Sequence, residues 1–322
     1  MSDIICTIDQ IISEIRNKVG NKRVIIAFSG GMDSTVVLHL AKYALKREQV
    51  IAVNIDFGNY TYRKARENVK KIAGDLQIRL FTISGQYQQI KIMAGGPDCN
   101  LCTKRIKLGL IKNSFKNNLI LTGSNQSDSW GKYGYAYYDG YFAPLFYCTK
   151  NEIKNIADYL NIKIHRIGEN KKREGCKLKH LLKPLVNFNY HGVAVDIANE
   201  MLLEKLSKSG IDADKANVKI VGTLNKNIAL VNIYPLPDSK WLEEIRIQIA
   251  NIKEIEECHI VDSPLELIIK ANKGQFNNLR SRFWIENGRL KPDFAFPVKI
   301  KWLLTSNRKL KTFQVVDYNI ID

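Results

Sequence analysis

At residues 28–35 the chain reads Phe28-Ser29-Gly30-Gly31-Met32-Asp33-Ser34-Thr35, and this stretch decides its fold. It follows the apolar run 23–28, which is typical of a buried parallel strand, and it leads into 34–46, whose apolar residues recur with a helical period. A loop between a strand and a helix meets the positive end of the helix dipole and its unpaired N–H groups. Paired glycines allow close backbone approach, and three hydroxyls add donors. The stretch therefore predicts a phosphate-binding loop.

The residues of this loop indicate which class of phosphate ligand it binds. Asp33 would repel a phosphate unless a Mg²⁺ ion lies between them, so we interpret it as a metal ligand or an orienting group. The loop lacks the Gly-Lys-Ser/Thr ending of a Walker A motif, and it does not have the GxGxxG spacing of dinucleotide-binding folds. The alternative is a glycine turn followed by a helix with hydroxyl caps.

Strand-like and helix-like segments alternate through the first half of the chain. After the loop these segments are 50–56, 62–76, 78–83, 104–115, 119–122 and 150–160. The alternation predicts an α/β fold with a doubly wound parallel sheet. After about residue 190 the pattern changes to a helix at 193–209, short β-like runs and a hairpin candidate at Asn287-Gly288. We expect an α/β domain over 1–190 and a smaller α+β domain over 191–322.

The composition is that of an ordinary soluble chain, with 45% hydrophobic and 25% charged residues. No apolar run approaches the roughly 20 residues of a membrane span. The N-terminus does not have the basic-then-apolar pattern of a signal peptide. Six cysteines in 322 residues are too few for a disulfide scaffold. We expect a cytoplasmic protein with reduced thiols and no membrane partner.

The loop at 28–35 resembles the SGGxDS PP-loop of the N-type ATP pyrophosphatases, which have a HUP-like fold and split ATP between the α- and β-phosphates. The resemblance implies ATP with Mg²⁺, bound by Ala27, Phe28, Ser29, Gly30, Gly31, Asp33, Ser34 and Thr35. It also implies an adenosine contact at Asp56 and a second nucleotide-contacting stretch at 121–128. There Gly123 and Asn125 would contact the nucleotide, and Asp128 would help to bind Mg²⁺. Without that resemblance, 121–128 is also typical of a surface loop.

A CxxC motif, Cys99-Asn100-Leu101-Cys102, follows the third predicted strand. The motif alone is typical of a redox dithiol, half of a zinc site or part of an iron–sulfur site. Cys176 lies 74 positions after Cys102, and His180 near it would supply a further zinc ligand. Two buried cysteines with a packing role are the plain alternative.

The order of these motifs resembles the sulfur-transferring branch of the PP-loop enzymes, which includes tRNA thiolation enzymes and LarE-like enzymes. The resemblance covers roughly residues 20–235. It implies catalysis by Asp33 and by three cysteines that hold a [4Fe-4S] cluster, with Zn²⁺ or a persulfide as alternatives; the cysteines are Cys99, Cys102 and Cys176. This chain departs from LarE-like proteins in lacking a Ser-Arg pair after Cys176 and in its aromatic stretch 130–147, which puts the acceptor in doubt.

The net charge of +17 is concentrated in two windows, 163–184 and 270–311. Lys and Arg neutralise phosphates, and aromatic side chains interleaved in the second window can stack on unpaired bases. We therefore predict tRNA as a partner bound through both windows. The alternative is a lysine-rich solvated surface over core aromatics.

These observations predict an ATP-dependent sulfurtransferase. It would adenylate an acceptor oxygen, release pyrophosphate and replace the oxygen with sulfur from a sulfur donor, the acceptor being a tRNA base. The alternatives are LarE-like sulfur insertion into a small-molecule carboxylate, an amidating PP-loop ligase with structural zinc, and a non-catalytic RNA-binding protein. A homodimer is compatible with the sequence.

Overall fold

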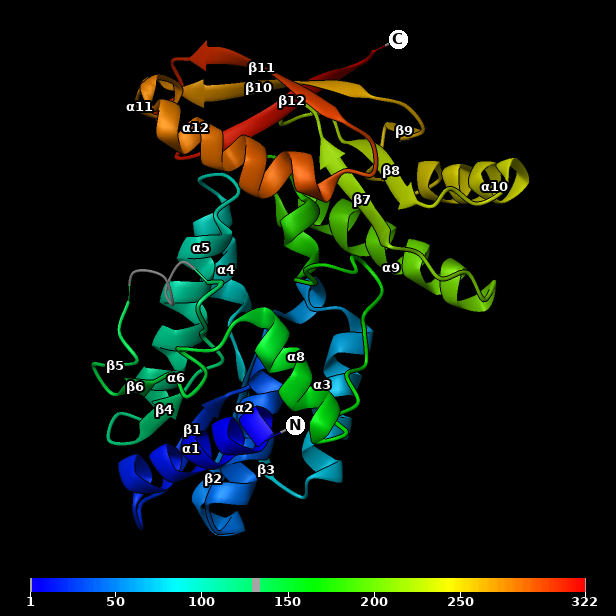
Figure 1. Ribbon diagram of the computed structural model, residues 1–322. Coiled ribbons are helices and arrows are strands. Elements are labelled where there is room, and N and C mark those ends of the chain that lie inside the picture. Colours follow the sequence, from blue (N-terminus) through cyan, green and yellow to red (C-terminus); the bar gives the residue numbers. More distant parts are fainter. Residues whose placement is uncertain (1, 129–133, 322) are drawn as a thin grey trace. The chain divides into compact units, whose positions relative to one another are not determined.

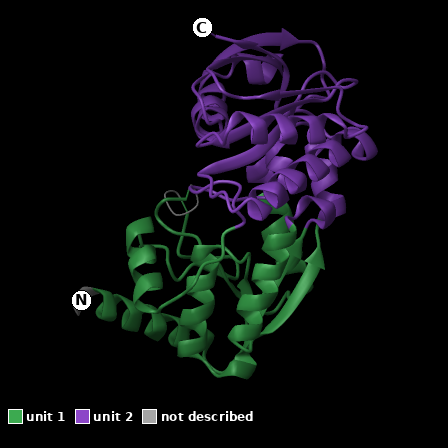
Figure 2. Ribbon diagram, turned by 90° about the vertical axis from the view of Figure 1, so that its right-hand side faces the viewer, with its two compact units in different colours: residues 1–56, 63–85, 103–166 green, residues 57–62, 86–102, 167–322 purple. Residues whose placement is uncertain are grey.

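The structure is a computed structural model that describes residues 2–128 and 134–321 (Figure 1). It contains two compact units (Figure 2). Unit 1 comprises residues 1–56, 63–85 and 103–166, and unit 2 comprises residues 57–62, 86–102 and 167–322. The expected boundary at 190 thus falls inside unit 2, which also takes two short segments from the first half. No helix in the described ranges is long and apolar enough to cross a membrane; the cytoplasmic location stays a prediction.

A six-stranded sheet forms the centre of unit 1. Its order is β3 (Arg79–Ser84), β2 (Val50–Asp56), β1 (Val24–Ala27), β4 (Leu119–Leu121), β6 (Tyr141–Phe142) and β5 (Tyr137–Tyr138). All neighbouring pairs are parallel except β5 and β6. The strand order reverses on either side of β1, so β1 and β4 flank the switch point where parallel sheets bind ligands. The predicted doubly wound α/β sheet is confirmed.

Helices cover both faces of this sheet (Figure 1). Strand residues alternate between the faces, and Val24, Ile26 and Val50 pack in one apolar cluster with helices α1 (Ser2–Val19), α2 (Met32–Ala44), α3 (Arg63–Asp75) and α8 (Lys150–Tyr159). Helix α6 (Gly109–Ser114) contacts β2, and its buried Ile111 lies outside that cluster, on the other face. Helix α1 was not predicted from the sequence, although Ile8, Ile11 and Ile15 recur at helical spacing and are buried.

Unit 2 contains two three-stranded sheets. One has the order β7 (Lys215–Val221), β8 (Ile228–Tyr234) and β9 (Glu257–Ile260); the other has the order β11 (Val298–Thr305), β10 (Leu265–Asn272) and β12 (Phe313–Ile320). Helix α9 (Val193–Lys208) packs on β7, and α10 (Ser239–Ala250) packs on β8 and β9. One apolar cluster, which includes Leu230, Leu267 and Phe313, joins the two sheets. The expected α+β region is therefore present, and its two sheets are smaller than the sheet of unit 1.

The hairpin predicted at Asn287-Gly288 is wrong. Both residues lie in the π-helical turn η6 (Glu286–Leu290), which continues helix α12 (Leu279–Ile285) after the short helix α11 (Lys273–Asn277). Ile285 and Leu290 pack in the cluster that joins the two sheets, and this burial favours a helical turn over a β-turn.

Candidate active site

The predicted phosphate loop connects β1 to α2 and is closed by its own hydroxyl groups. Ser34 Oγ accepts a hydrogen bond from Ser29 N at 3.2 Å and donates one to Gly31 O at 3.0 Å. Thr35 Oγ1 also donates to Gly31 O, at 2.9 Å. The first-turn amides of α2 have no carbonyl partner within the helix, so they are available to an anion. The loop has the geometry of an anion cradle at the carboxyl end of a parallel strand.

Two glycines make the close approach of this loop to its neighbours possible. Gly30 has φ +76°, and a Cβ there would lie 2.9 Å from Val69 Cγ2. A Cβ on Gly123 would lie 2.9 Å from both Asp33 Cβ and Ser34 N. The predicted second stretch, 121–128, therefore packs its backbone directly against the start of α2.

Asn125 joins the two predicted Mg²⁺ ligands. Its side chain is fully buried, and Nδ2 donates to Asp33 Oδ2 and to Asp128 Oδ2, at 3.2 Å each. Mg²⁺ commonly binds proteins through one or two carboxylates and takes its other ligands from water and phosphate. Asp33 and Asp128 therefore fit a Mg²⁺ ion that is carried in with the phosphates of ATP.

Lys150 is a site residue that sequence reasoning missed. Its Nζ forms an ion pair with Asp33. Lys150 is the first residue of α8, whose start is fixed by a capping box in which Glu152 N donates to Thr149 Oγ1 at 3.3 Å. The Thr-Lys-Asn-Glu sequence predicted this helix start, but only the packing of α8 against α2 brings the lysine to the loop.

The end of β2 approaches the same loop. Asn54 Nδ2 donates to Phe28 O at 2.9 Å, and Phe28 N donates to Val53 O at 2.9 Å. Both carboxylate oxygens of Asp56 accept from Arg66 Nε, at 3.1 and 3.0 Å. Asp56 is thus held by an arginine in this structure, and its predicted contact with adenosine stays a prediction.

A pair of thiols lies within unit 2. Gln89, on helix α4 (Gln86–Met93), donates from Nε2 toward Cys176 Sγ at 3.3 Å and toward Cys102 Sγ at 3.8 Å. Cys102 ends the short helix α5 (Cys99–Cys102), which Asp98 caps by accepting from Leu101 N at 2.9 Å. Two of the three predicted cysteines are therefore brought together, although they are far apart in the sequence.

The third cysteine does not join this pair. Cys99 is half-buried at the start of α5, and in residues 2–128 and 134–321 no three His, Cys, Asp or Glu side chains are grouped to hold a metal ion. His180, considered as a zinc ligand, points both ring nitrogens elsewhere: Nδ1 lies 3.1 Å from Lys219 Nζ, and Nε2 lies 3.2 Å from Glu169 Oε2. The side chains thus fit a two-thiol site rather than a cluster or zinc site.

A buried charge network supports the segment that carries Cys176. Glu169 Oε1 accepts from Gly175 N at 2.7 Å, and Lys219 Nζ lies 3.3 Å from Asp293 Oδ2. Burial lowers the pKa of His180 to about 4 and that of Lys219 to about 8. Burial alone would raise the pKa of Asp293, but the positive charges of Lys219 and Lys179 hold it well below its usual range.

The two basic windows differ in what they expose. In 163–184, four lysines have internal partners: Lys171 pairs with Asp214, Lys177 with Asp196 and Glu200, Lys179 with Glu169 and Asp293, and Lys183 donates to two backbone carbonyls. In 270–311, eight basic residues are exposed: Lys273, Arg280, Lys291, Lys299, Lys301, Arg308, Lys309 and Lys311. Only the second window offers most of its charge to a partner.

Some of the aromatic residues in the second basic window are buried and others are exposed. Phe294 is buried, whereas Phe283 and Trp284 on α12 are exposed. The Arg282 guanidinium stacks on Phe276, at 5.2 Å from the ring centroid. Of the aromatic stretch 130–147, Trp130 and Tyr133 lie outside the described residues.

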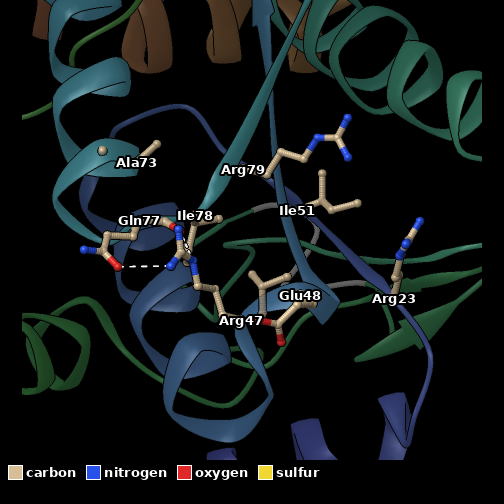
Figure 3. Close-up of a pocket in the computed structure, with 10 residues that line it drawn as sticks. Arg23, Arg47, Glu48, Ile51, Ala73, Gln77, Ile78 and Arg79 are labelled. Atoms are coloured by element: carbon tan, nitrogen blue, oxygen red, sulfur yellow. Dashed lines mark hydrogen bonds between the residues drawn. The ribbon is translucent and has the colours of Figure 1, made fainter.

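A hollow of about 600 Å³ lies at the amino ends of strands β1, β2 and β3 of the unit 1 sheet, away from the phosphate loop at the carboxyl end of β1 (Figure 3). Arg23 and Arg79 line it, and Arg47 donates from Nε to Gln77 O at 2.7 Å. Parallel sheets bind nucleotides at the carboxyl ends of their strands, so this hollow is not the predicted ATP site.

Comparison with known proteins identifies similarity over the first half of the chain. The family model described as NAD synthase matches residues 4–172. The glutamine-hydrolyzing GMP synthase of Syntrophomonas wolfei is 34% identical over 88 residues, which are 27% of this chain and 17% of that protein. The corresponding GMP synthase of Helicobacter pylori strain G27 is 40% identical over 75 residues, or 23% of this chain and 14% of that protein. The match thus spans less than a fifth of these curated relatives.

Among solved structures, the NH3-dependent NAD synthetase from Campylobacter jejuni, in complex with the nitrate ion, matches with a TM-score of 0.41 and 26% sequence identity. The match covers 49% of this chain and 74% of that one.

Proposed function

The chain belongs to the NAD synthase family, and from that membership we propose that it is an ATP-dependent adenylating enzyme of the PP-loop type. One observation carries the proposal: Asp33 and Asp128, which are far apart in sequence, share the buried Asn125 amide beside the loop that opens α2. This arrangement suits a nucleotide whose phosphates lie on the loop and whose Mg²⁺ ion lies on the carboxylates.

The proposed first step is attack by an acceptor oxygen on the α-phosphorus of ATP. The bond from the α-phosphorus to the bridging oxygen breaks, and pyrophosphate leaves with that oxygen. The first-turn amides of α2 and the Lys150 ammonium stabilise the negative charge that develops on the departing group. The acceptor becomes an adenylate, which turns a poor leaving oxygen into AMP.

Measurement of the products tests this step. With acceptor present, we expect AMP and pyrophosphate in equal amounts, and Asp33→Asn should lower the rate by about 100-fold or more because it removes a Mg²⁺ ligand. Asp9→Asn, on the exposed face of α1, is the control. Formation of ADP and phosphate by the wild type would contradict the proposal.

For the second step we propose sulfur transfer through the thiol pair Cys102 and Cys176. A sulfane-sulfur donor leaves a persulfide on Cys176, whose terminal sulfur attacks the acceptor carbon. The carbon–oxygen bond breaks and AMP leaves with the electron pair. Cys102 then attacks Cys176 Sγ, the acceptor keeps the outer sulfur, and a Cys102–Cys176 disulfide remains for an external dithiol to reduce. The contacts of both sulfurs with Gln89 support this assignment.

Cysteine variants separate the two steps. Cys176→Ala should still release pyrophosphate but should form no thiolated product, and Cys102→Ala should accumulate the acceptor as a mixed disulfide. Cys148→Ala, at a buried cysteine of unit 1, is the control. Thiolation at the wild-type rate in Cys176→Ala would sink the sulfur step. Anaerobic iron, sulfide and zinc analysis tests the alternative in which Cys99 joins the pair as a ligand of a [4Fe-4S] cluster or of zinc.

The acceptor we propose is a tRNA base. The exposed basic residues of 270–311 support this choice, because they provide the charge that neutralises an RNA backbone. The alternative acceptor is a small-molecule carboxylate, as in LarE-like enzymes. Thiolated nucleosides in digests of tRNA incubated with enzyme, ATP and a sulfur donor would support the RNA acceptor, and their absence would favour the carboxylate.

Amidation is the second candidate, and the names of the similar proteins favour it: NAD synthase and GMP synthase. In this case ammonia, rather than sulfur, displaces AMP from the adenylate. The double variant Cys102→Ala/Cys176→Ala separates the candidates. Full ammonia-dependent product formation by this variant would establish amidation and would leave the thiols without a catalytic role.

A further inference from the structure

Gln89 is buried in a way that its role in the fold does not explain. Its side chain is 1% exposed, and its Oε1 has no hydrogen-bond partner in the described part of the chain. The hydrogen bonds recorded for its Nε2 there go to the sulfurs of Cys102 and Cys176. A buried amide is destabilising unless it is hydrogen-bonded, and sulfur is a weak acceptor. This side chain is therefore placed for the two sulfurs rather than for stability.

The helix that carries Gln89 is fixed at its far end. Met93 O, on the last residue of α4, accepts from Leu185 N at 2.9 Å, and Gly95 O accepts from Lys311 N at 2.7 Å. These backbone hydrogen bonds come from segments far along the chain. Gln89 is consequently carried by a helix whose C-terminal end is anchored by backbone hydrogen bonds.

We propose that Gln89 is a positioning residue that keeps Cys102 and Cys176 as separate, reduced thiols. The proposal rests on the proposed sulfur-transfer function. Nε2 now donates toward both sulfurs, and a sulfur in a disulfide is a weaker acceptor than a thiolate sulfur, so bonding Cys102 to Cys176 weakens these contacts. With Oε1 also unpartnered, the amide would then be buried with still weaker hydrogen bonds. The fold thus penalises the disulfide relative to the dithiol.

This penalty assists the proposed cycle. Each sulfur transfer ends with a Cys102–Cys176 disulfide, and a new persulfide forms only after that disulfide is reduced. A disulfide that the surrounding protein disfavours has a less negative reduction potential, so an external dithiol reduces it more readily. Gln89 would therefore speed the return of the enzyme to its reduced state without contacting the acceptor or ATP.

The test is the equilibrium of the purified full-length protein with glutathione. Two protein thiols and one oxidised glutathione give the protein disulfide and two reduced glutathione molecules, and mass spectrometry of digests quantifies the Cys102–Cys176 disulfide. In Gln89→Met, which keeps the length of the side chain but removes the amide, we expect the equilibrium constant for disulfide formation to rise about tenfold. This change corresponds to a reduction potential about 30 mV more negative.

The matched control is Gln88→Met, at an exposed neighbouring position on the same helix, and it should leave the constant unchanged. If Gln89→Met fails to fold, Gln89→Asn serves instead, because its shorter side chain keeps the amide but reaches neither sulfur from the same backbone. An unchanged or lower constant in the folded variant would overturn the proposal, as would the absence of a Cys102–Cys176 disulfide in fully oxidised wild type.

The measurement uses neither ATP nor acceptor, so it is independent of the proposed function. If Gln89→Met raises the equilibrium constant tenfold but the wild type transfers no sulfur, Gln89 still keeps the thiol pair reduced, and only the proposed sulfur transfer is rejected. Sulfur transfer by a wild type whose constant equals that of Gln89→Met would reject the positioning role alone.

Discussion

Gly123 is the residue at which the second nucleotide stretch touches the start of α2. An alanine there would place its Cβ 2.9 Å from Ser34 N, which is backbone and cannot move aside without shifting the loop. We expect Gly123→Ala to weaken ATP binding at least tenfold and to lower the free energy of unfolding by about 1–3 kcal/mol. Calorimetric ATP titration and urea unfolding measure the two effects.

Gly109→Ala is the control for this prediction. Gly109 starts helix α6, and no atom lies within 4 Å of the Cβ that an alanine would add. This variant should bind ATP normally and should be as stable as the wild type or more stable by about 0.5–1 kcal/mol. Equal ATP affinity in both variants would refute the packing argument for Gly123.

Lys150 offers a second test at the scale of one residue. It is half-exposed, so its ion pair with Asp33 contributes little to stability. We expect Lys150→Met to lower the rate of pyrophosphate release about 10- to 100-fold while the unfolding curve stays unchanged. Lys154→Met, on the exposed side of the same helix, should have no effect on either. A wild-type rate in Lys150→Met would remove this residue from the site.

The residues of the loop were predictable because their roles are local. Ser34 and Thr35 bond within the turn that they form, and Asp33 and Asn125 lie in short motifs at the ends of strands. Gln89 was not predictable, because the sulfur of its contact residue Cys176 comes from 87 positions away. No local pattern marks a glutamine whose partners are set by the packing of distant segments.

At the scale of elements, the network around His180 makes the stability of unit 2 depend on pH. His180 is fully buried, and its pKa is lowered to about 4 from an ordinary value near 6.5. The unfolded chain therefore binds a proton between pH 6.5 and 4 that the folded chain does not, so stability falls by about 3 kcal/mol over this range. The lowered pKa values of Glu169 and Asp293 continue the loss at lower pH.

Urea unfolding followed by tryptophan fluorescence checks this prediction, since Trp241, Trp284 and Trp302 all lie in unit 2. His180→Gln should be less stable at pH 7 and should lose less stability between pH 6.5 and 4. His259→Gln, at an exposed histidine, should keep the wild-type slope. An unaltered slope in His180→Gln would show that other groups set the acid sensitivity.

The sequence predicted most strands and helices because apolar periodicity was clear in them: β2, for example, begins and ends at the expected residues. It failed where burial is decided by a partner surface. Helix α12 contains aromatic residues, which are typical of strands, but α12 and η6 form helical turns because Ile285 and Leu290 pack in the cluster that joins the two sheets.

At the scale of the whole molecule, the net charge of +17 is only partly available to a partner. Lys177 and Lys183 are buried and satisfied inside unit 2, whereas Lys299 and Lys301 are exposed on strand β11. We expect the double variant Lys299→Ala/Lys301→Ala to bind tRNA about tenfold more weakly near 100 mM salt. The slope of log K against log salt should become shallower by roughly 0.7–0.9 for each lysine that contacts phosphate.

The control is Lys70→Ala/Lys71→Ala, which removes two exposed charges from α3 in unit 1. It has the same net charge as the test variant, so an equal loss of affinity in both would show that the charge acts as a general field and that 270–311 has no special role. Filter binding at several salt concentrations measures tRNA binding by both variants.

The division into units was the least predictable feature, because 86–102 belongs to unit 2 together with residues far along the chain.

The hydrogen bond from Lys311 N to Gly95 O has a consequence for the synthesis of this protein. The CxxC motif leaves the ribosome about 200 residues before the segment that anchors its loop, at the 5–20 residues per second of translation. For at least 10 seconds or so, Cys99 and Cys102 are therefore part of a nascent chain that still lacks Lys311 and strand β12. Until that segment is made, an oxidant meets the two thiols without the backbone hydrogen bond that anchors their loop in the folded protein.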